Sequence, residues 1–245
     1  MKLFQTISKN KRLKNKQIGI SENRQYRCLV GQFEQIPRVI WQDIQDPFEI
    51  GLQQMLTRRE CFSSSGAEEV SKLTQPFIDN TKPKFTLIRA VSHHYIWRKR
   101  VLLPLVDSEQ LIYKQAIQIL EQELPLPIEQ VYFDFKIKQQ IEKQLTQITL
   151  FALRKAFADP LLSEYPTILD NETHCYWRGF HYLFPKLENH FLKIGSLNFQ
   201  FNSNGLTLSE EDNGIDITTL DFPEKILSPH LYLSALGASL WNGTA

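Results

Sequence analysis

The sequence predicts a mixed α/β fold. Apolar runs typical of strands alternate with amphipathic segments typical of helices, most clearly between residues 85 and 137, where two strand-like runs flank one helical segment. Near the amino terminus a polar turn joins two more strand-like runs. With 245 residues, 42% of them hydrophobic, the chain can bury the core of one large domain or two small ones.

The amino-terminal third predicts a β-meander followed by two helices. Residues 16–20, 25–30 and 38–44 have the apolar runs of three short strands. A helix then begins at Asp46-Pro47, with proline at its first position, and a second begins at Ser65-Gly66.

The middle of the chain predicts strand, strand, helix and strand in that order. Residues 85–91 have the pattern of a buried strand, and residues 95–103 that of a second strand, which Pro104 ends. After the helix, the strand pattern resumes over residues 131–137.

The central helix has a predicted start, face and end. Asp107 can cap it, with Gln110 three residues on as a capping-box partner. Pro125 and Pro127 end it, because proline lacks the backbone donor and displaces the preceding residue from the α region. Its apolar stripe consists of Ile112, Ala116, Ile119 and Leu120.

The carboxyl-terminal part returns to mixed structure. Residues 147–157 are an apolar segment leading toward a helix, and residues 171–183 have apolar positions at helical spacing. Short strands are predicted over 191–201 and, more weakly, over 205–208, before a terminal helix over 229–240.

Charge excludes a global attraction to nucleic acid or lipid. The chain has 28 basic and 27 acidic side chains, a formal net charge of +1. Residues 1–16 form a basic arm; a solvated tail is the favoured interpretation, with attraction to an anionic membrane surface the alternative. No apolar run reaches the ~20 residues of a membrane span and no secretory signal follows the arm, so we expect a cytoplasmic protein.

No complete catalytic or metal-binding motif is present. The three cysteines form no CxxC pair, so neither a disulfide framework nor a zinc knuckle is indicated. His93 and His94 are neighbours, and neighbours on a strand point to opposite faces, so we expect a turn rather than a metal pair there. We predict no metal ligands and no catalytic residues.

The run Arg98-Lys99-Arg100 lies beside Tyr95 and Trp97, a mixture of basic and aromatic residues that single-stranded nucleic acids favour. On a strand, however, the three charges divide between two faces. A half-exposed structural strand is therefore the first interpretation, peptide binding the second and nucleic-acid binding the third.

Several motifs together resemble one family: PilM with its shorter relatives HofM and ComA, actin-like cytosolic proteins of type IV pilus and competence DNA-uptake machines. The resemblance covers most of the chain and is most specific in the central block. The matching segments are residues 98–104, 107–123, 124–129, 131–135, 149–152, 168–170 with Arg178, and 235–238.

This resemblance implies an actin-like fold. Residues 17–91 and 141–183 would form a first, ribonuclease-H-like lobe, and residues 92–140 a small inserted strand-helix-strand subdomain. Residues 184–245 would form a second lobe with the terminal helix. That lobe is truncated, since only about 30 residues separate Phe201 from the helix, too few for a full nucleotide-binding lobe.

The family's longer members place an Asp-x-Gly turn after the first strand and another at the start of the second lobe, where backbone N–H groups approach phosphates. Here the first position has Gly19 and Ser21 without Asp-x-Gly, and the second has Lys193, Gly195 and Ser196, with lysine in place of aspartate. An ordinary hairpin is favoured at the second position. We therefore expect no cofactor, with binding of ATP and Mg²⁺ weak or absent.

The resemblance implies a role in holding the cytosolic tail of a PilN-like inner-membrane protein, in a cleft between the insert and the first lobe. The candidate contacts are Arg89, Trp97, Arg98, Tyr132 and Phe133. The leading hypothesis is a non-catalytic adaptor of a competence or type IV pilus assembly, peripheral to the inner membrane. An actin-like ATPase and a nucleic-acid-binding protein are the alternatives.

Overall fold

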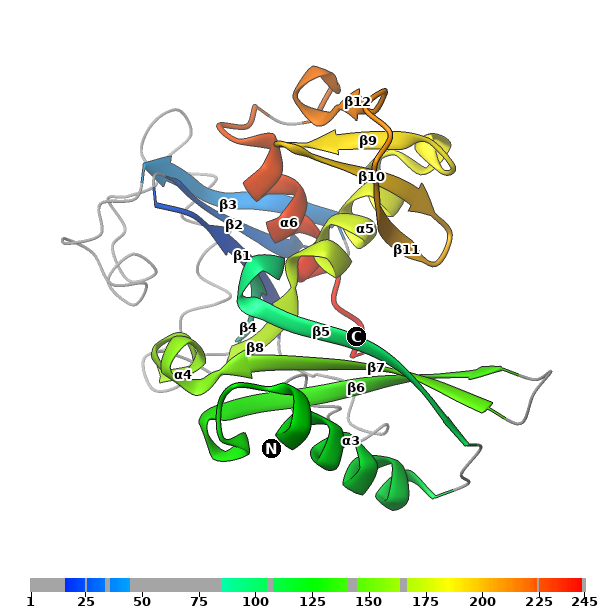
Figure 1. The fold of residues 1–245 in the computed structure, drawn as a ribbon. Helices are drawn as coiled ribbons and strands as arrows, with labels where there is room; N and C mark the ends of the chain where they lie inside the picture. The colour runs from blue at the N-terminus through cyan, green and yellow to red at the C-terminus, as the bar shows by residue number, and fades with distance from the viewer. Residues whose placement is uncertain are drawn as a thin grey trace.

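The computed structural model describes residues 16–24, 26–33, 36–44, 85–104, 108–140, 145–163, 167–223 and 225–243. Outside these ranges lie most of the basic arm, both predicted helices between residues 46 and 77, and Asp107. The described residues form three sheets, and two of these sheets enclose a pair of helices (Figure 1).

The first sheet has five strands in the order β3-β2-β1-β4-β8. β1 is parallel to β4, and β4 to β8, whereas β2 is antiparallel to both β1 and β3, which confirms the predicted meander. This order is that of a ribonuclease-H-like sheet. The bounds are β1 (Lys16–Glu22), β2 (Tyr26–Phe33), β3 (Ile36–Ile44), β4 (Phe85–Val91) and β8 (Thr167–Asn171).

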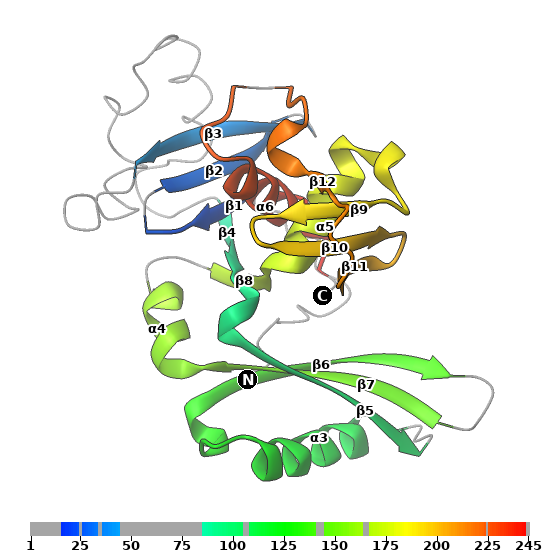
Figure 2. The same ribbon diagram turned by 45° about the horizontal axis from the view of Figure 1, so that its top comes forward.

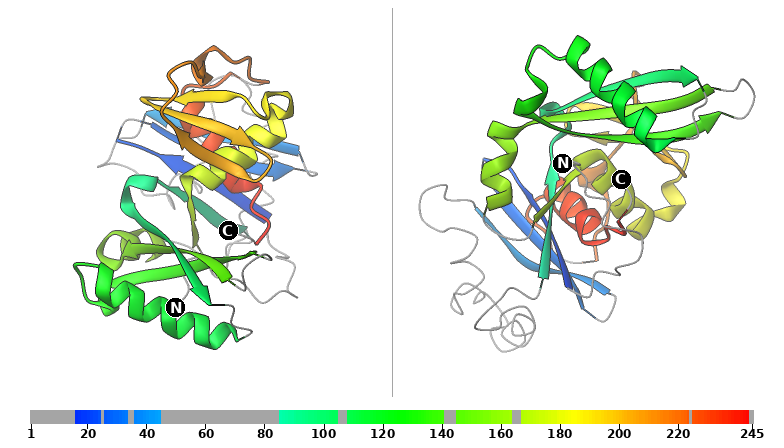
Figure 3. Two further views of the ribbon diagram at one scale, coloured as in Figure 1. Left: turned by 45° about the vertical axis from the view of Figure 1, so that its right-hand side comes forward. Right: turned by 90° about the horizontal axis from the view of Figure 1, so that it is seen from below.

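The inserted subdomain is an antiparallel sheet of order β5-β7-β6 with one helix on it (Figure 2). Its elements are β5 (Ile96–Pro104), α3 (Glu109–Glu123), β6 (Val131–Gln140) and β7 (Leu145–Arg154). Three residues of the predicted helical stripe, Ile112, Ala116 and Leu120, are buried against this sheet. Figure 3 shows α3 on the outer side of the sheet, away from α5 (Glu172–Leu183) and α6 (Pro229–Ser239).

Two expectations about the insert need correction. β7 was assigned to the first lobe, but it is the central strand of the insert sheet, and its Ile148 and Leu150 are buried under α3. The insert therefore extends past residue 140 to Arg154. The residue before α3 is Ser108, whose side chain makes no capping hydrogen bond.

After β7, the helix α4 (Lys155–Ser163) leads to β8. Asn171 then caps α5, accepting a hydrogen bond from the Thr173 amide at 2.9 Å. Within α5, Arg178 forms a short ion pair with the fully buried Asp170 of β8, and its Nε donates to the Gly237 carbonyl at 2.7 Å. One guanidinium thus joins β8, α5 and α6.

The second lobe is reduced to a four-stranded sheet of order β11-β10-β9-β12 in the described residues. Its apolar face packs on Tyr176 and Phe180 of α5. The bounds are β9 (Phe191–Ile194), β10 (Leu197–Asn202), β11 (Gly205–Ser209) and β12 (Ile215–Asp216). Single 3-10 turns are η3 (His93–Tyr95), η4 (Ile128–Gln130), η5 (Pro185–Leu187) and η6 (Ile217–Thr219).

The terminal helix α6 lies at the centre of the molecule. Its residues from Leu231 to Ser239 are all buried, because α6 lies between the five-stranded sheet and α5. Close approach needs glycine: a Cβ at Gly19 would overlap the Ala235 carbonyl, and one at Gly237 would overlap the Cys175 carbonyl. α6 was predicted as part of the second lobe, but its partners are β1, β2 and α5.

The whole is the predicted actin-like fold: a ribonuclease-H-like lobe, an inserted subdomain and a truncated second lobe. No helix among the described residues is long and apolar enough to cross a membrane.

Candidate functional site

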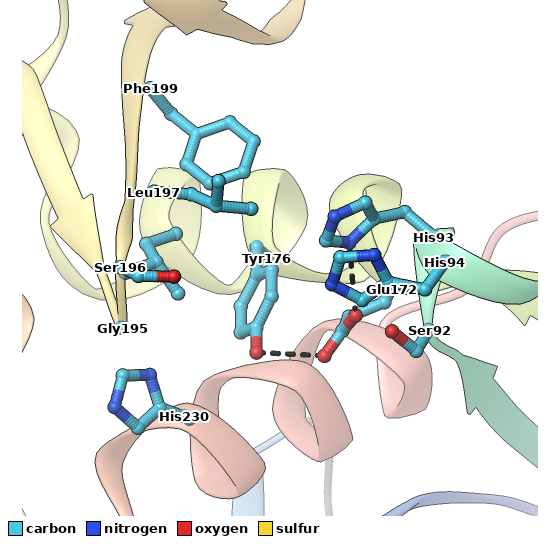
Figure 4. Close-up of a pocket in the computed structure, with 11 residues that line it drawn as sticks. Ser92, His93, His94, Glu172, Tyr176, Gly195, Ser196, Leu197, Phe199 and His230 are labelled. Atoms are coloured by element: carbon cyan, nitrogen blue, oxygen red, sulfur yellow. Dashed lines mark hydrogen bonds and ion pairs between the residues drawn. The ribbon is translucent and has the colours of Figure 1, made fainter.

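The first candidate site is a pocket of about 240 Å³ between the two lobes, which we call the interlobe pocket (Figure 4). It forms where η3, the amino-terminal ends of α5 and α6, and the β9–β10 hairpin meet. Its lining residues are Ser92, His93, His94, Glu172, Tyr176, Ile194, Gly195, Ser196, Leu197, Phe199 and His230.

Glu172 is the carboxylate of this pocket. Its Oε1 accepts a hydrogen bond from the Tyr176 hydroxyl at 2.9 Å, and its Oε2 lies 3.5 Å from Nδ1 of His93. Burial, together with the Glu172 charge, raises the pKa of Tyr176, while burial lowers the pKa of His230. The pocket therefore contains a carboxylate hydrogen-bonded to a buried phenol, beside a His230 whose pKa is lowered.

The structure separates the two predicted phosphate turns. Gly195 and Ser196 line the interlobe pocket, in a hairpin turn where Gly195 has a φ of 63°. Lys193 lies on β9 between Asn198 and Asp216, outside the lining residues. Gly19 and the buried Ser21 lie on β1, where Gly19 packs against α6. The predicted hairpin at residues 193–196 is confirmed.

The described residues contain no cluster of three or more side chains that could hold a metal ion. His93 and His94 lie in the predicted turn, η3, with their ring centroids 4.0 Å apart. Their position between β4 and β5 makes them part of the connection from the first lobe to the insert.

Arg89, one of the five predicted partner contacts, is an internal residue. It is only 4% exposed and forms a short ion pair with Glu22, which also accepts from Arg27 Nε at 2.7 Å. This network ties β4 to β1 and β2, so Arg89 stabilises the first lobe.

The other four predicted contacts divide between the two faces of the insert sheet. Trp97 and Phe133 pack on the α3 side, and Phe133 is 7% exposed. Arg98 and Tyr132 lie on the opposite side, where the Tyr132 hydroxyl donates to Asp159 at 2.8 Å. The five residues therefore do not share one surface.

The second candidate site is an apolar groove of about 370 Å³ where the insert joins the first lobe, which we call the hinge groove. Its most exposed aromatic residue is Tyr95, 56% exposed, whose ring stacks on Phe157 of α4 at 4.2 Å between centroids. Its lining residues are His94, Tyr95, Ile96, Trp97, Leu124, Pro125, Leu126, Val131, Ala152, Leu153, Arg154 and Phe157.

Of the predicted contacts, only Trp97 lines the hinge groove. Tyr95, Leu126 and Phe157 also line this groove, and none of them is among the five predicted contacts. The run Leu124-Pro125-Leu126-Pro127 was a usable signal, because its prolines end α3 and its first three residues line the groove together with β5. Phe157 had no local signal, since only the packing of α4 brings it to Tyr95.

No family model matches the sequence, and no curated protein matches it. Among solved structures, the chain is similar to a PilM-PilN type IV pilus biogenesis complex, with 13% identity and a TM-score of 0.53 over 80% of this chain and 61% of that one. The chain thus spans less than two thirds of that relative. This likeness shows the fold.

Two further structures are similar at lower TM-scores. The cytoplasmic domain of EpsL, an inner-membrane component of the type II secretion system of Vibrio cholerae, has a TM-score of 0.46 at 11% identity, covering 90% of this chain and 94% of that one. A Bacteroides thetaiotaomicron protein with an actin-like ATPase fold has a TM-score of 0.39 at 11% identity, covering 82% of this chain and 71% of that one.

Proposed function

We propose that this chain is a non-catalytic cytoplasmic adaptor of a competence or type IV pilus assembly, which binds the cytosolic tail of a PilN-like inner-membrane protein. The observation that carries the proposal is the hinge groove, an apolar site on the insert of a fold shared with the PilM-PilN complex. The adaptor would thereby be peripheral to the inner membrane without inserting into it.

The groove has two features that suit an extended peptide. Tyr95 is an exposed aromatic residue held in place by Phe157, as expected of an interface anchor. β5 is an edge strand that pairs only with β7 among the described strands, so its outer edge is open to backbone hydrogen bonds from a peptide.

The competing function is actin-like ATP binding. The observation in its favour is that Gly195 and Ser196, on the second predicted phosphate turn, line the interlobe pocket. Against it, Glu172 places a negative charge in the same pocket, and the glycine of β1 packs against α6. We therefore propose an adaptor that needs no nucleotide.

The test is binding of a fluorescent peptide that carries the amino-terminal cytosolic tail of the PilN-like membrane protein, measured by anisotropy against the scrambled peptide. We expect saturable binding to the wild type and a loss of about tenfold or more for Tyr95→Ala, because an aromatic anchor is removed. Tyr182→Ala, which removes a 46% exposed tyrosine from α5, is the matched control and should bind normally.

Folding is verified by circular dichroism for each variant. A folded wild type that fails to bind the tail peptide would contradict the adaptor function. Equal losses for Tyr95→Ala and Tyr182→Ala would place the peptide outside the hinge groove.

A further inference from the structure

The face of the insert sheet opposite α3 has a chemical character of its own. Trp97, Val101 and Leu103 of β5 pack on the α3 side, so strand alternation turns Arg98, Arg100 and Leu102 to the other side. Lys99 confirms the alternation, because its Nζ lies 2.6 Å from Glu123 of α3.

Three cations lie on this second face, which we call the basic face. Arg98 and Arg100 come from β5, and Lys136 from β6 shares the Thr149 level of β7 with Arg100. All three side chains are exposed, and the structure records no ion pair between them and any other described residue. The arginines are close enough that Arg100, after burial, lowers the pKa of Arg98.

One carboxylate, Asp134, lies on the same face of β6 as Lys136, so the three cations leave this face with a net positive charge. Asp134 of β6 is 8% exposed, and its Oδ1 accepts from the Phe135 amide at 2.9 Å. At the inner end of the face, His174 of α5 packs edge-on against Phe151, and its burial lowers its pKa to about 4, so it is neutral. Asp170 behind it is fully buried and paired with Arg178.

We propose that the basic face is a second docking surface, for an extended acidic segment of a partner protein with the pattern acid-x-acid-x-apolar. Alternate residues of an extended chain are about 6.8 Å apart, so two acids two residues apart match Arg98 and Arg100 along β5. The apolar residue then meets Leu102, which is 54% exposed beside them.

A peptide fits this face better than other polyanions. The two aromatic residues identified on it, Phe151 and Tyr132, are packed in the cluster with α4 and do not offer a stacking platform for bases. The exposed Leu102 also has no use in binding phosphates. The sheet face lies toward α5 and the second lobe, so a single chain reaches it more readily than a flat bilayer does (Figures 1 and 3).

The surface is separate from the hinge groove, and the proposal stands without the proposed function. It adds a second, charge-dependent contact that one partner, or two different ones, can use. Salt weakens such a contact, because the cations are exposed.

The test is anisotropy of a fluorescent peptide with the sequence Glu-Ala-Glu-Ala-Leu, with Gln-Ala-Gln-Ala-Leu as the uncharged probe, near physiological ionic strength. We expect the acidic peptide alone to bind, with about a fivefold loss for Arg100→Gln and a similar loss for Lys136→Gln. Lys99→Gln is the matched control: it removes the same charge from the neighbouring residue, on the other face, and should bind like the wild type.

Three results would overturn the proposal. One is no binding of the acidic peptide to the folded protein, and another is an equal loss for Lys99→Gln and Arg100→Gln, which indicates a diffuse field. The third is tighter binding of an oligothymidine or of phosphatidylglycerol vesicles that depends on Arg100, which assigns the face to phosphates. Lys136→Gln decides the matter if Arg100→Gln fails to fold.

Discussion

The interlobe pocket and the insert differ in how their residues are packed. In the interlobe pocket, Glu172 and Tyr176 form a hydrogen-bonded pair, and outside this pocket Gly19 of β1 packs against α6. The insert, by contrast, keeps an apolar core under α3 and borders a groove lined by the exposed Tyr95. The comparison teaches that the central packing of an actin-like fold does not depend on Asp-x-Gly turns at these two positions.

The largest expected effect comes from breaking the packing of α6 on α5. Gly237→Ala adds a Cβ that overlaps the Cys175 carbonyl backbone, which a side-chain rotation cannot relieve. We expect a loss of about 4 kcal/mol or more in the free energy of unfolding, measured by urea denaturation.

Gly195→Ala is the control for that substitution. Nothing lies within 4 Å of its Cβ, and only the φ of 63° adds strain, so the cost should be about 1 kcal/mol. Equal costs for the two variants would mean that the α5–α6 contact is not tight.

The second prediction concerns the insert as a separate cooperative unit. Leu120→Ala removes a fully buried side chain from α3 and should cost about 3 kcal/mol. Hydrogen exchange should accelerate in β5, β6 and β7 while β1 and β4 keep their protection. Leu111→Ala, at a 50% exposed position of the same helix, should change neither; uniform acceleration in all sheets would show one cooperative unit.

The third prediction uses pH to test the junction between α5 and the insert. Burial holds the pKa of His174 at about 4, below its usual 6.5, with Asp170 opposing the shift. The unfolded chain therefore binds the proton more readily, and stability present above pH 6.5 is lost as the pH falls toward 4. Between pH 7 and 5 we expect His174 to contribute a loss of about 2 kcal/mol.

The measurement is urea unfolding of the wild type and His174→Gln at both pH values. The variant should lose less stability than the wild type on acidification, because glutamine does not titrate. An identical decrease in both proteins would show that His174 is hydrated in the folded state.

The smallest expected effect is the change in melting temperature when a nucleotide is added. Mg-ATP at millimolar concentration should leave the melting temperature unchanged. A ligand raises the melting temperature appreciably only if its dissociation constant for the folded state lies below the ligand concentration. The tail peptide is the positive control, because its binding should raise the melting temperature. Micromolar binding of Mg-ATP in isothermal titration would contradict this prediction and indicate that the interlobe pocket binds a nucleotide.

Local patterns predicted the elements well. Apolar runs located β1 to β3, the helix stripe located the buried face of α3, and helical spacing over residues 171–183 located α5. The pattern of β5 and β6 shows which residues alternate but not which face is covered, so it did not predict how the five candidate partner contacts divide between surfaces. Trp97 and Arg98 are neighbours in sequence yet belong to different surfaces.

By itself, the sequence determined the types of the described elements, which depend on local periodicity. The truncated second lobe and the two phosphate turns without Asp-x-Gly were implied by the resemblance to the PilM family. Only the tertiary structure decided that β7 completes the insert, that Gly19 packs against α6, and that Tyr95 meets Phe157 across the hinge groove. Such contacts join residues far apart in the chain, and side-chain shape and long-range strand pairing, rather than local pattern, select them.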